Sequence, residues 1–157
     1  ALYDASRAGV EIDLIIRGVC TLRPGVPGLS ENIRVRSIVG RLLEHSRVYY
    51  FENGGDAKIY TGSSDWMPRN LDRRVEVLTP VYSPPIRRYL RDEFLQSYLR
   101  DTAKAREMMS DGRYVYARTA PGADDFDSQM SFQVQPNIVS FDTMIASHEE
   151  EYVDQTF

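Results

Sequence analysis

The amino-acid sequence predicts an α/β fold in which a mixed sheet carries helices on at least one face. Short apolar or alternating runs, rich in β-branched and aromatic residues, recur between residues 11 and 81, and loops with Gly and Pro separate them. Residues 83–109 instead repeat apolar side chains about every four positions, as an amphipathic helix does. With 157 residues, of which 42% are hydrophobic, the chain is long enough for one compact domain with a core.

The N-terminal half is expected to hold most of the strands. Its expected elements, in chain order, are a helix (1–9), a strand (11–18), a loop (20–32), a strand (33–40), a turn (41–45) and a hairpin of strands 47–53 and 57–63 around a turn at 54–56. The apolar run IDLII predicts the first strand, and the Gly and Pro residues that follow predict the loop. Alternate residues of a strand share a face, so Arg34 and Arg36 are expected on one side of theirs.

The C-terminal half is expected to contain the longest helix. Its expected elements are a loop (64–74), a strand (75–81), a helix (83–109), and a turn with a last short strand (111–118). Ser83 can cap the helix, and the two prolines after it suit a first helical turn. The apolar stripe from Ile86 to Leu99 is expected to pack on the sheet.

The charge of the chain is unevenly distributed. All 19 Lys and Arg residues lie in residues 1–118 beside 15 acids, whereas residues 119–157 hold 8 acids and no base. We therefore expect a folded domain over 1–118, followed by an acidic tail over 119–157 that is poorly ordered or ordered only by contact with something else. Since 17 of the bases are Arg, which binds phosphate oxygens in a bidentate way, the domain is suited to polyanions.

Several classes of protein are excluded or disfavoured. A single cysteine, Cys20, excludes an internal disulfide and a cysteine-based zinc site, and it fits a reducing, cytoplasmic compartment. No apolar stretch is long enough for a membrane span, and no signal peptide is recognisable. Since the chain begins with Ala in a helical pattern, we expect it to be a piece of a longer protein.

The best candidate for chemistry is His45, which precedes a strand and is followed by Arg47. Residues i and i+2 of an extended chain point the same way, so both side chains are expected at one site. The partner strand of the hairpin ends at Ser63 and Ser64, whose hydroxyls and amides can hold phosphate oxygens. An imidazole near arginines can donate a proton to a leaving oxygen while the cations offset charge on a transferring phosphoryl group.

These residues resemble a degenerate form of the phospholipase D signature, H-x-K followed by G-S-x-N. Arg47 stands in place of the lysine and Asp65 in place of the final asparagine, and the signature's Asp has no clear counterpart. That departure argues against phosphodiester hydrolysis by this chain.

Longer strings resemble the last domain of bacterial polyphosphate kinase: RPGVPGLSENI, SSDWMPRNLDRR, and KAREM with DGRYVYAR, while DDFDSQMSFQ fits it more loosely. The resemblance implies a phospholipase D-like mixed sheet flanked by helices, and a parent enzyme that reversibly moves the terminal phosphate of ATP onto inorganic polyphosphate. It assigns Arg17 and His45 to ATP contact, with His45 assisting transfer. Possible phosphate contacts are Arg47, Ser63, Ser64 and Arg69. The phosphorylated histidine, and the residues that bind Mg²⁺, are implied to lie mainly outside this chain, and no metal ligand is assigned within it.

The resemblance also implies partners and a location. The partners are ATP, ADP, inorganic polyphosphate and the missing domains of the same enzyme, with a homo-oligomeric parent and no nucleic acid. The parent is expected in the cytoplasm, with peripheral membrane association left open. The isolated chain is expected to be inactive. Two alternatives are a non-catalytic polyanion-binding regulatory module and a phospholipase D-type hydrolase that works as a homodimer.

Overall fold

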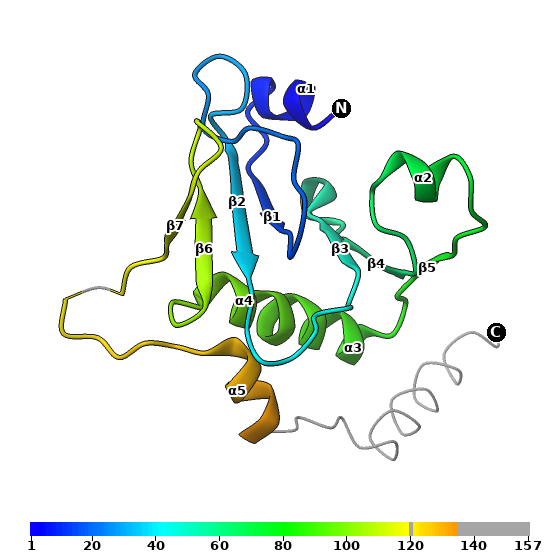
Figure 1. The fold of residues 1–157 in the computed structure, drawn as a ribbon. Helices are drawn as coiled ribbons and strands as arrows, with labels where there is room; N and C mark the ends of the chain where they lie inside the picture. Colours follow the sequence, from blue (N-terminus) through cyan, green and yellow to red (C-terminus); the bar gives the residue numbers. More distant parts are fainter. Residues whose placement is uncertain (120, 135–157) are drawn as a thin grey trace. The chain divides into compact units, whose positions relative to one another are not determined.

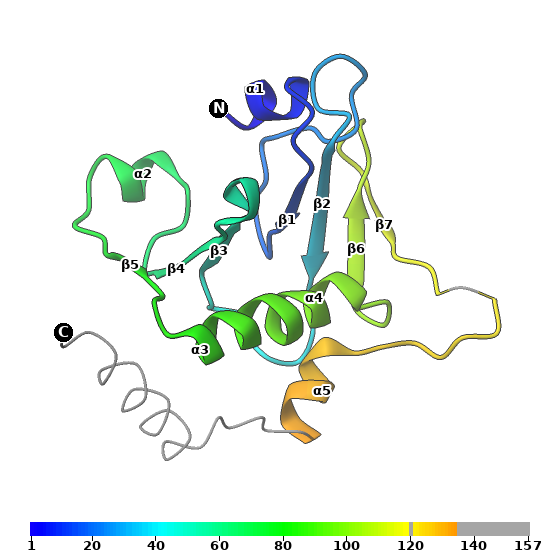
Figure 2. The ribbon, with the colours of Figure 1, turned by 180° about the vertical axis from the view of Figure 1, so that it is seen from behind.

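Figures 1 and 2 show a computed structural model of the chain, which describes residues 1–119 and 121–134. The described residues form two compact units: the first comprises residues 1–44 and 95–134, and the second comprises residues 45–94. Each unit has its own sheet and its own helices, so the expected mixed α/β architecture is confirmed. Within the described part of the chain, no helix is long and apolar enough to cross a membrane.

The first unit is built on a four-stranded mixed sheet with the strand order β1-β2-β6-β7. The strands are β1 (Ile12–Ile15), β2 (Ile33–Ile38), β6 (Ala105–Met108) and β7 (Tyr114–Tyr116). Strand β1 is parallel to β2, whereas β6 pairs antiparallel with both β2 and β7. Strand β2 supplies much of the core, because Ile33, Val35 and Ile38 are each only 2% exposed while Arg34 between them faces outward.

Three short α-helices belong to the first unit: α1 (Leu2–Arg7), α4 (Gln96–Arg100) and α5 (Ser128–Val134). Helix α1 is tied to the start of β2, since the Asn32 side chain donates to the Ser6 carbonyl at 2.8 Å and the Asn32 backbone N–H donates to the Ser6 hydroxyl at 3.2 Å. Helix α5 packs on α4 through the rings of Phe132 and Tyr98, whose centroids are 5.4 Å apart.

The second unit holds a three-stranded antiparallel sheet in the order β3-β4-β5. Its elements are β3 (Val48–Phe51), the 3₁₀ turn η1 (Asn53–Gly55), β4 (Lys58–Gly62), α2 (Pro68–Leu71), β5 (Leu78–Pro80), α3 (Pro84–Arg88) and the π-helix η2 (Tyr89–Leu95). The expected hairpin is present, and Asn53, Gly54 and Gly55 all have positive φ at its turn. That conformation is easiest for Gly, which explains the pair of glycines. Ile59 on β4 is the most deeply buried apolar residue of this sheet, at 3% exposure.

The helix expected over residues 83–109 is shorter than the sequence indicated. The chain is helical from Pro84 to Arg100 and then turns, and Ala105–Met108 forms strand β6 instead. Asp101 explains the turn, because its completely buried carboxylate accepts the backbone N–H groups of Lys104 and Ala105 at 2.8 and 2.9 Å. These bonds replace the continuation of the helix, and β6 then pairs with β2.

The strand expected over residues 75–81 is also shorter, since β5 covers only Leu78–Pro80. The register explains the difference: Leu78 pairs with Gly62, the last residue of β4, so the preceding residues have no strand opposite them. Val75 is accordingly fully exposed.

The acidic segment that begins at residue 119 is not a uniformly unordered tail. Residues 128–134 form α5, and the Ser128 backbone and hydroxyl donate to the buried Asp101 carboxylate at 2.8 and 2.7 Å. This part of the segment therefore belongs to the first unit. The remainder, residues 135–157, lies outside the described residues, and the division into domains at residue 118 stays a prediction.

Candidate functional site

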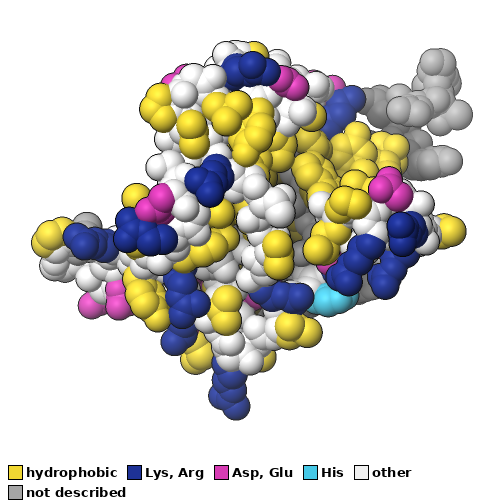
Figure 3. Space-filling model, turned by 45° about the horizontal axis from the view of Figure 1, so that its top comes forward, with side chains coloured by type: hydrophobic (Ala, Val, Ile, Leu, Met, Phe, Trp, Pro, Cys, Tyr) yellow, Lys and Arg dark blue, Asp and Glu magenta, His cyan; other side chains and the backbone are white. Residues whose placement is uncertain are grey.

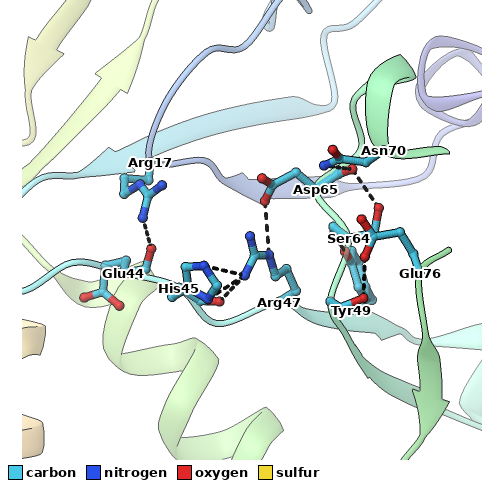
Figure 4. A network of polar contacts seen from close by, with 10 residues as sticks. Arg17, Glu44, His45, Arg47, Tyr49, Ser64, Asp65, Asn70 and Glu76 are labelled. Carbon is cyan, nitrogen blue, oxygen red and sulfur yellow. Dashed lines mark hydrogen bonds and ion pairs between the residues drawn. The ribbon is translucent and has the colours of Figure 1, made fainter. Parts of the chain in front are cut away.

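His45 and Arg47 lie together at the start of β3 in the second unit. The Arg47 guanidinium lies 2.7 Å from His45 Nδ1 and 3.2 Å from Nε2, and it donates to the His45 carbonyl oxygen at 2.8 Å (Figure 4). A guanidinium only donates, and it lies within hydrogen-bond distance of both ring nitrogens, so it approaches the imidazole as a cation and does not select one tautomer.

Asp65 holds Arg47 from the other side. Its Oδ1 accepts from Arg47 Nε at 3.1 Å, and the Arg47 side chain is only 16% exposed while that of Asp65 is 47% exposed. Figure 4 shows the guanidinium between the imidazole and the carboxylate. From the sequence, Asp65 was recognised only as a departure from the phospholipase D signature, and its contact with Arg47 was not predicted. The carboxylate fixes the direction of the cation, and it also offsets part of its charge.

Ser63 and Ser64 are both used within the turn that follows β4. The Ser63 hydroxyl donates to the Glu76 carboxylate and accepts the Val77 backbone N–H at 3.1 Å. The Ser64 hydroxyl donates to the Asp65 carbonyl at 2.9 Å, and the Ser64 carbonyl accepts from the Tyr49 hydroxyl at 2.7 Å. The structure therefore gives the two serines a local structural role and brings neither hydroxyl into hydrogen-bond contact with His45 or Arg47.

Tyr49 and Trp66 form an aromatic pair beside the Arg47–Asp65 contact. Their rings are stacked, with centroids 5.2 Å apart and an interplanar angle of 5°, and Trp66 keeps 54% of its surface exposed. Burial, together with the negative charge of Asp65, raises the pKa of the Tyr49 phenol above its ordinary value. The phenol therefore stays neutral and can donate to Ser64 at all ordinary pH values.

Arg69 is exposed on the short helix α2 and forms no hydrogen bond or ion pair with any described residue. Next to it, Asn70 is buried and donates to the Asp65 carbonyl at 3.2 Å. On the face drawn in Figure 3, several Lys and Arg side chains lie close to one another, and others are separated by hydrophobic side chains.

Arg17 belongs to the first unit, where it follows the end of β1. Its side chain is exposed, and its guanidinium donates to the backbone carbonyl of Glu44 (Figure 4). Its own carbonyl accepts from the hydroxyl of Ser37 on β2 at 3.2 Å. The first unit therefore fixes Arg17 at both its backbone and its guanidinium.

The described residues offer no ready metal centre, because among them no three His, Cys, Asp or Glu side chains gather closely enough to hold an ion. The groups that the two units do present are guanidinium cations, one exposed imidazole, and backbone and hydroxyl groups. Groups of these kinds are chemically suited to binding and polarising anionic oxygens.

Comparison with known proteins supplies the family. The family model described as polyphosphate kinase C-terminal domain 2 matches residues 1–129. The chain belongs to the polyphosphate kinase family. The match extends past residue 118 and includes the first two residues of α5.

Individual polyphosphate kinases agree with this assignment. The enzyme of Synechocystis sp. is 54% identical over 135 residues, which are 86% of this chain, and that of Neisseria meningitidis is 55% identical over 129 residues, which are 82% of it. The crystal structure of polyphosphate kinase from Porphyromonas gingivalis superimposes with a TM-score of 0.78 at 44% identity over 83% of this chain. The phospholipase D-like fold implied by the sequence is thereby confirmed. The chain covers only 18–20% of the length of these three relatives.

Proposed function

We propose that this chain is the nucleotide- and polyphosphate-contacting part of an enzyme that reversibly transfers the terminal phosphate of ATP to inorganic polyphosphate. The proposal is supported by the family, and above all by one contact: the exposed imidazole of His45 is held by the Arg47 guanidinium, which is itself held by Asp65. An oriented imidazole beside a fixed cation is suited to phosphoryl transfer.

The proposed chemistry follows from the contact between the His45 imidazole and the Arg47 guanidinium. In the transfer, the bond between the terminal phosphorus and the bridging oxygen of ADP breaks, and a bond to an accepting group forms. A ring N–H of His45 can donate to the oxygen on which negative charge develops, while guanidinium groups offset charge on the phosphoryl oxygens. His45 thus assists the transfer, and the histidine that carries the phosphate is proposed to lie in a part of the enzyme outside this chain.

The two candidate ATP ligands belong to different units, Arg17 to the first and His45 to the second. We propose that both contact ATP, which is the substrate, and that Arg47 and Arg69 contribute to binding polyphosphate. Mg²⁺ is proposed to be held mainly by residues outside this chain. Because the histidine that carries the phosphate is proposed to lie outside this chain, the isolated chain is expected to be inactive. We also propose that the complete enzyme is a cytoplasmic homo-oligomer.

A non-catalytic polyanion-binding module remains the alternative, because Asp65 occupies one side of Arg47 and both serine hydroxyls are engaged within their turn. In that case His45 would be dispensable for turnover, and only the arginines would matter for binding.

An experiment on the complete enzyme that contains this chain distinguishes the assisting role of His45 from the non-catalytic binding module. Wild type, His45→Ala and His45→Gln are compared for incorporation of labelled phosphate from ATP into protein and for polyphosphate synthesis. His148→Gln, at the only other histidine of the chain and beyond the family match, serves as the control. We expect labelling to persist and synthesis to fall by about 100-fold in both His45 variants, the range typical for loss of a general acid. Synthesis at the wild-type level would refute the assisting role and favour the binding module.

A further inference from the structure

The segment that leads into His45 is held by a buried glutamine from α5. Gln129 is 4% exposed, and its side-chain amide forms three hydrogen bonds with this segment. Its Oε1 accepts the Leu42 N–H at 2.9 Å, and its Nε2 donates to the Leu42 carbonyl at 2.9 Å and to Glu44 Oε1 at 2.7 Å. The two bonds to Leu42 imitate the pairing of a neighbouring strand, and together the three bonds fix the orientation of the amide.

The same segment is shaped to receive that amide. A Cβ atom added at Gly40 would overlap Gln129 Oε1 and lie 2.8 Å from its Cδ, closer than Cβ atoms normally approach other heavy atoms. Gly40 does not have a positive φ, so its backbone does not require glycine. The absence of a side chain at residue 40 is therefore explained by the space that the Gln129 amide occupies.

Glu44 connects this contact to Arg17. Glu44 Oε1 accepts from Gln129, and Oε2 accepts from the hydroxyl of Tyr98, which is 7% exposed, at 2.7 Å. The backbone oxygen of the same residue accepts from the Arg17 guanidinium. All three oxygens of Glu44 are thus engaged, and the acceptor for Arg17 is fixed by two buried side chains. All of these residues belong to the first unit.

We propose that Gln129 and Tyr98 are positioning residues for Arg17, and that they act through Glu44. This inference rests on the proposed role of Arg17 in binding ATP. Arg17 is exposed and has many rotamers, so holding it in one direction before the nucleotide arrives lowers the entropy lost on binding. The family match ends at Gln129, in the segment that the sequence assigned to an acidic tail. The inference gives the start of that segment a role in nucleotide affinity.

The inference is tested by steady-state kinetics of the complete enzyme containing this chain. Gln129→Ala removes the amide, Gly40→Ala displaces it without altering Gln129, and Tyr98→Phe removes only the hydroxyl. Each is expected to raise KM for ATP about 2- to 10-fold, the range of one or two lost hydrogen bonds, with kcat changed less than about 2-fold. Gln133→Ala, an exposed glutamine on the same helix, is the matched control and should leave KM unchanged.

Two further comparisons separate positioning from a general structural effect. Glu44→Gln keeps only one of the two side-chain acceptor oxygens and should raise KM for ATP less than Glu44→Ala, which should behave like Gln129→Ala. Combined with Arg17→Ala, Gln129→Ala should raise KM no further, because the group that it positions is already absent. Melting temperatures identify variants that lose stability, and Tyr98→Phe, which keeps the packed ring, remains informative if Gln129→Ala folds poorly.

The outcomes distinguish the inference from the proposed function. If Arg17→Ala raises KM for ATP but Gln129→Ala, Gly40→Ala and Tyr98→Phe do not, the positioning inference alone is refuted. Additive effects of Arg17→Ala and Gln129→Ala on KM would also refute it alone. If Arg17→Ala leaves KM unchanged, the ATP-binding role of Arg17 is refuted, and the inference with it.

Discussion

Glu44 and His45 are neighbours in the chain, yet their surroundings differ sharply. Every oxygen of Glu44 accepts a hydrogen bond from a side chain of the first unit. The His45 side chain, in contrast, is exposed, and its polar contacts within the described residues are all with Arg47. Glu44 is therefore fixed by three hydrogen bonds, whereas the imidazole of His45 is exposed to solvent. Such a contrast is consistent with the proposal that the His45 side chain contacts a substrate.

In the first unit, which holds Glu44, the largest loss of stability is expected when Asp101 is replaced. Its buried carboxylate accepts four hydrogen bonds, two from backbone N–H groups at the turn after α4 and two from Ser128 at the start of α5. Asp101→Ala leaves these buried donors without a partner and should lower the free energy of unfolding by about 3 kcal/mol or more. Urea unfolding measures the loss. Asp111→Ala, at an exposed turn, is the control and should change stability by less than about 0.5 kcal/mol.

In the second unit, which holds His45, Tyr49→Phe should have a moderate effect on the free energy of unfolding. It keeps the stack on Trp66 but removes the bond to the Ser64 carbonyl, which should cost about 1 kcal/mol. Because the pKa of Tyr49 is raised in the folded state, its contribution is fully present below the ordinary phenol pKa and is lost as the pH rises through the folded value. Stability of the wild type should therefore fall more steeply than that of Tyr49→Phe in alkaline solution, as thermal melts above about pH 9 would show. Parallel pH profiles would mean that Tyr49 does not titrate as described.

The smallest effect is expected for Asp65→Asn, which restores the asparagine of the phospholipase D signature. The change removes a negative charge beside Arg47 while preserving the shape of the side chain. Because the pair is partly exposed, stability should fall by less than about 1 kcal/mol. If Arg47 contacts polyphosphate, KM for polyphosphate should decrease about 2- to 5-fold, since the cation is less neutralised. A raised KM would show that Asp65 serves chiefly to orient Arg47.

Local patterns in the sequence were sufficient for much of the fold. The alternation of strand residues located β2 and the hairpin, and the i, i+2 spacing correctly brought His45 and Arg47 together. The stripe from Ile86 to Leu99 located the helix, but it could not show that Asp101 ends it, because that depends on a carboxylate buried by the rest of the first unit.

Contacts between distant residues explain what the sequence could not show. Gln129 meets Leu42 and Glu44 across more than eighty residues, and no local periodicity predicts such a pair. Helix α5 could not be predicted for the same reason, since its acidic flank suggests solvation while its first residue, Ser128, bonds to the buried Asp101. Asp65 was visible in sequence, but its ion pair with Arg47 required the hairpin geometry.

The central claim is that the two sides of the Glu44–His45 peptide bond do different work: Arg17, held by Glu44, binds nucleotide, and His45 assists transfer. The most direct measurement is the initial rate of polyphosphate synthesis by the complete enzyme as a function of ATP concentration, for wild type, Arg17→Ala and His45→Gln. The account predicts that Arg17→Ala raises KM for ATP about 10-fold or more while kcat changes little, as expected for loss of a charged hydrogen-bonding group. It predicts that His45→Gln lowers kcat about 100-fold with KM nearly unchanged. Equal effects of both variants on KM, with kcat intact, would contradict the account.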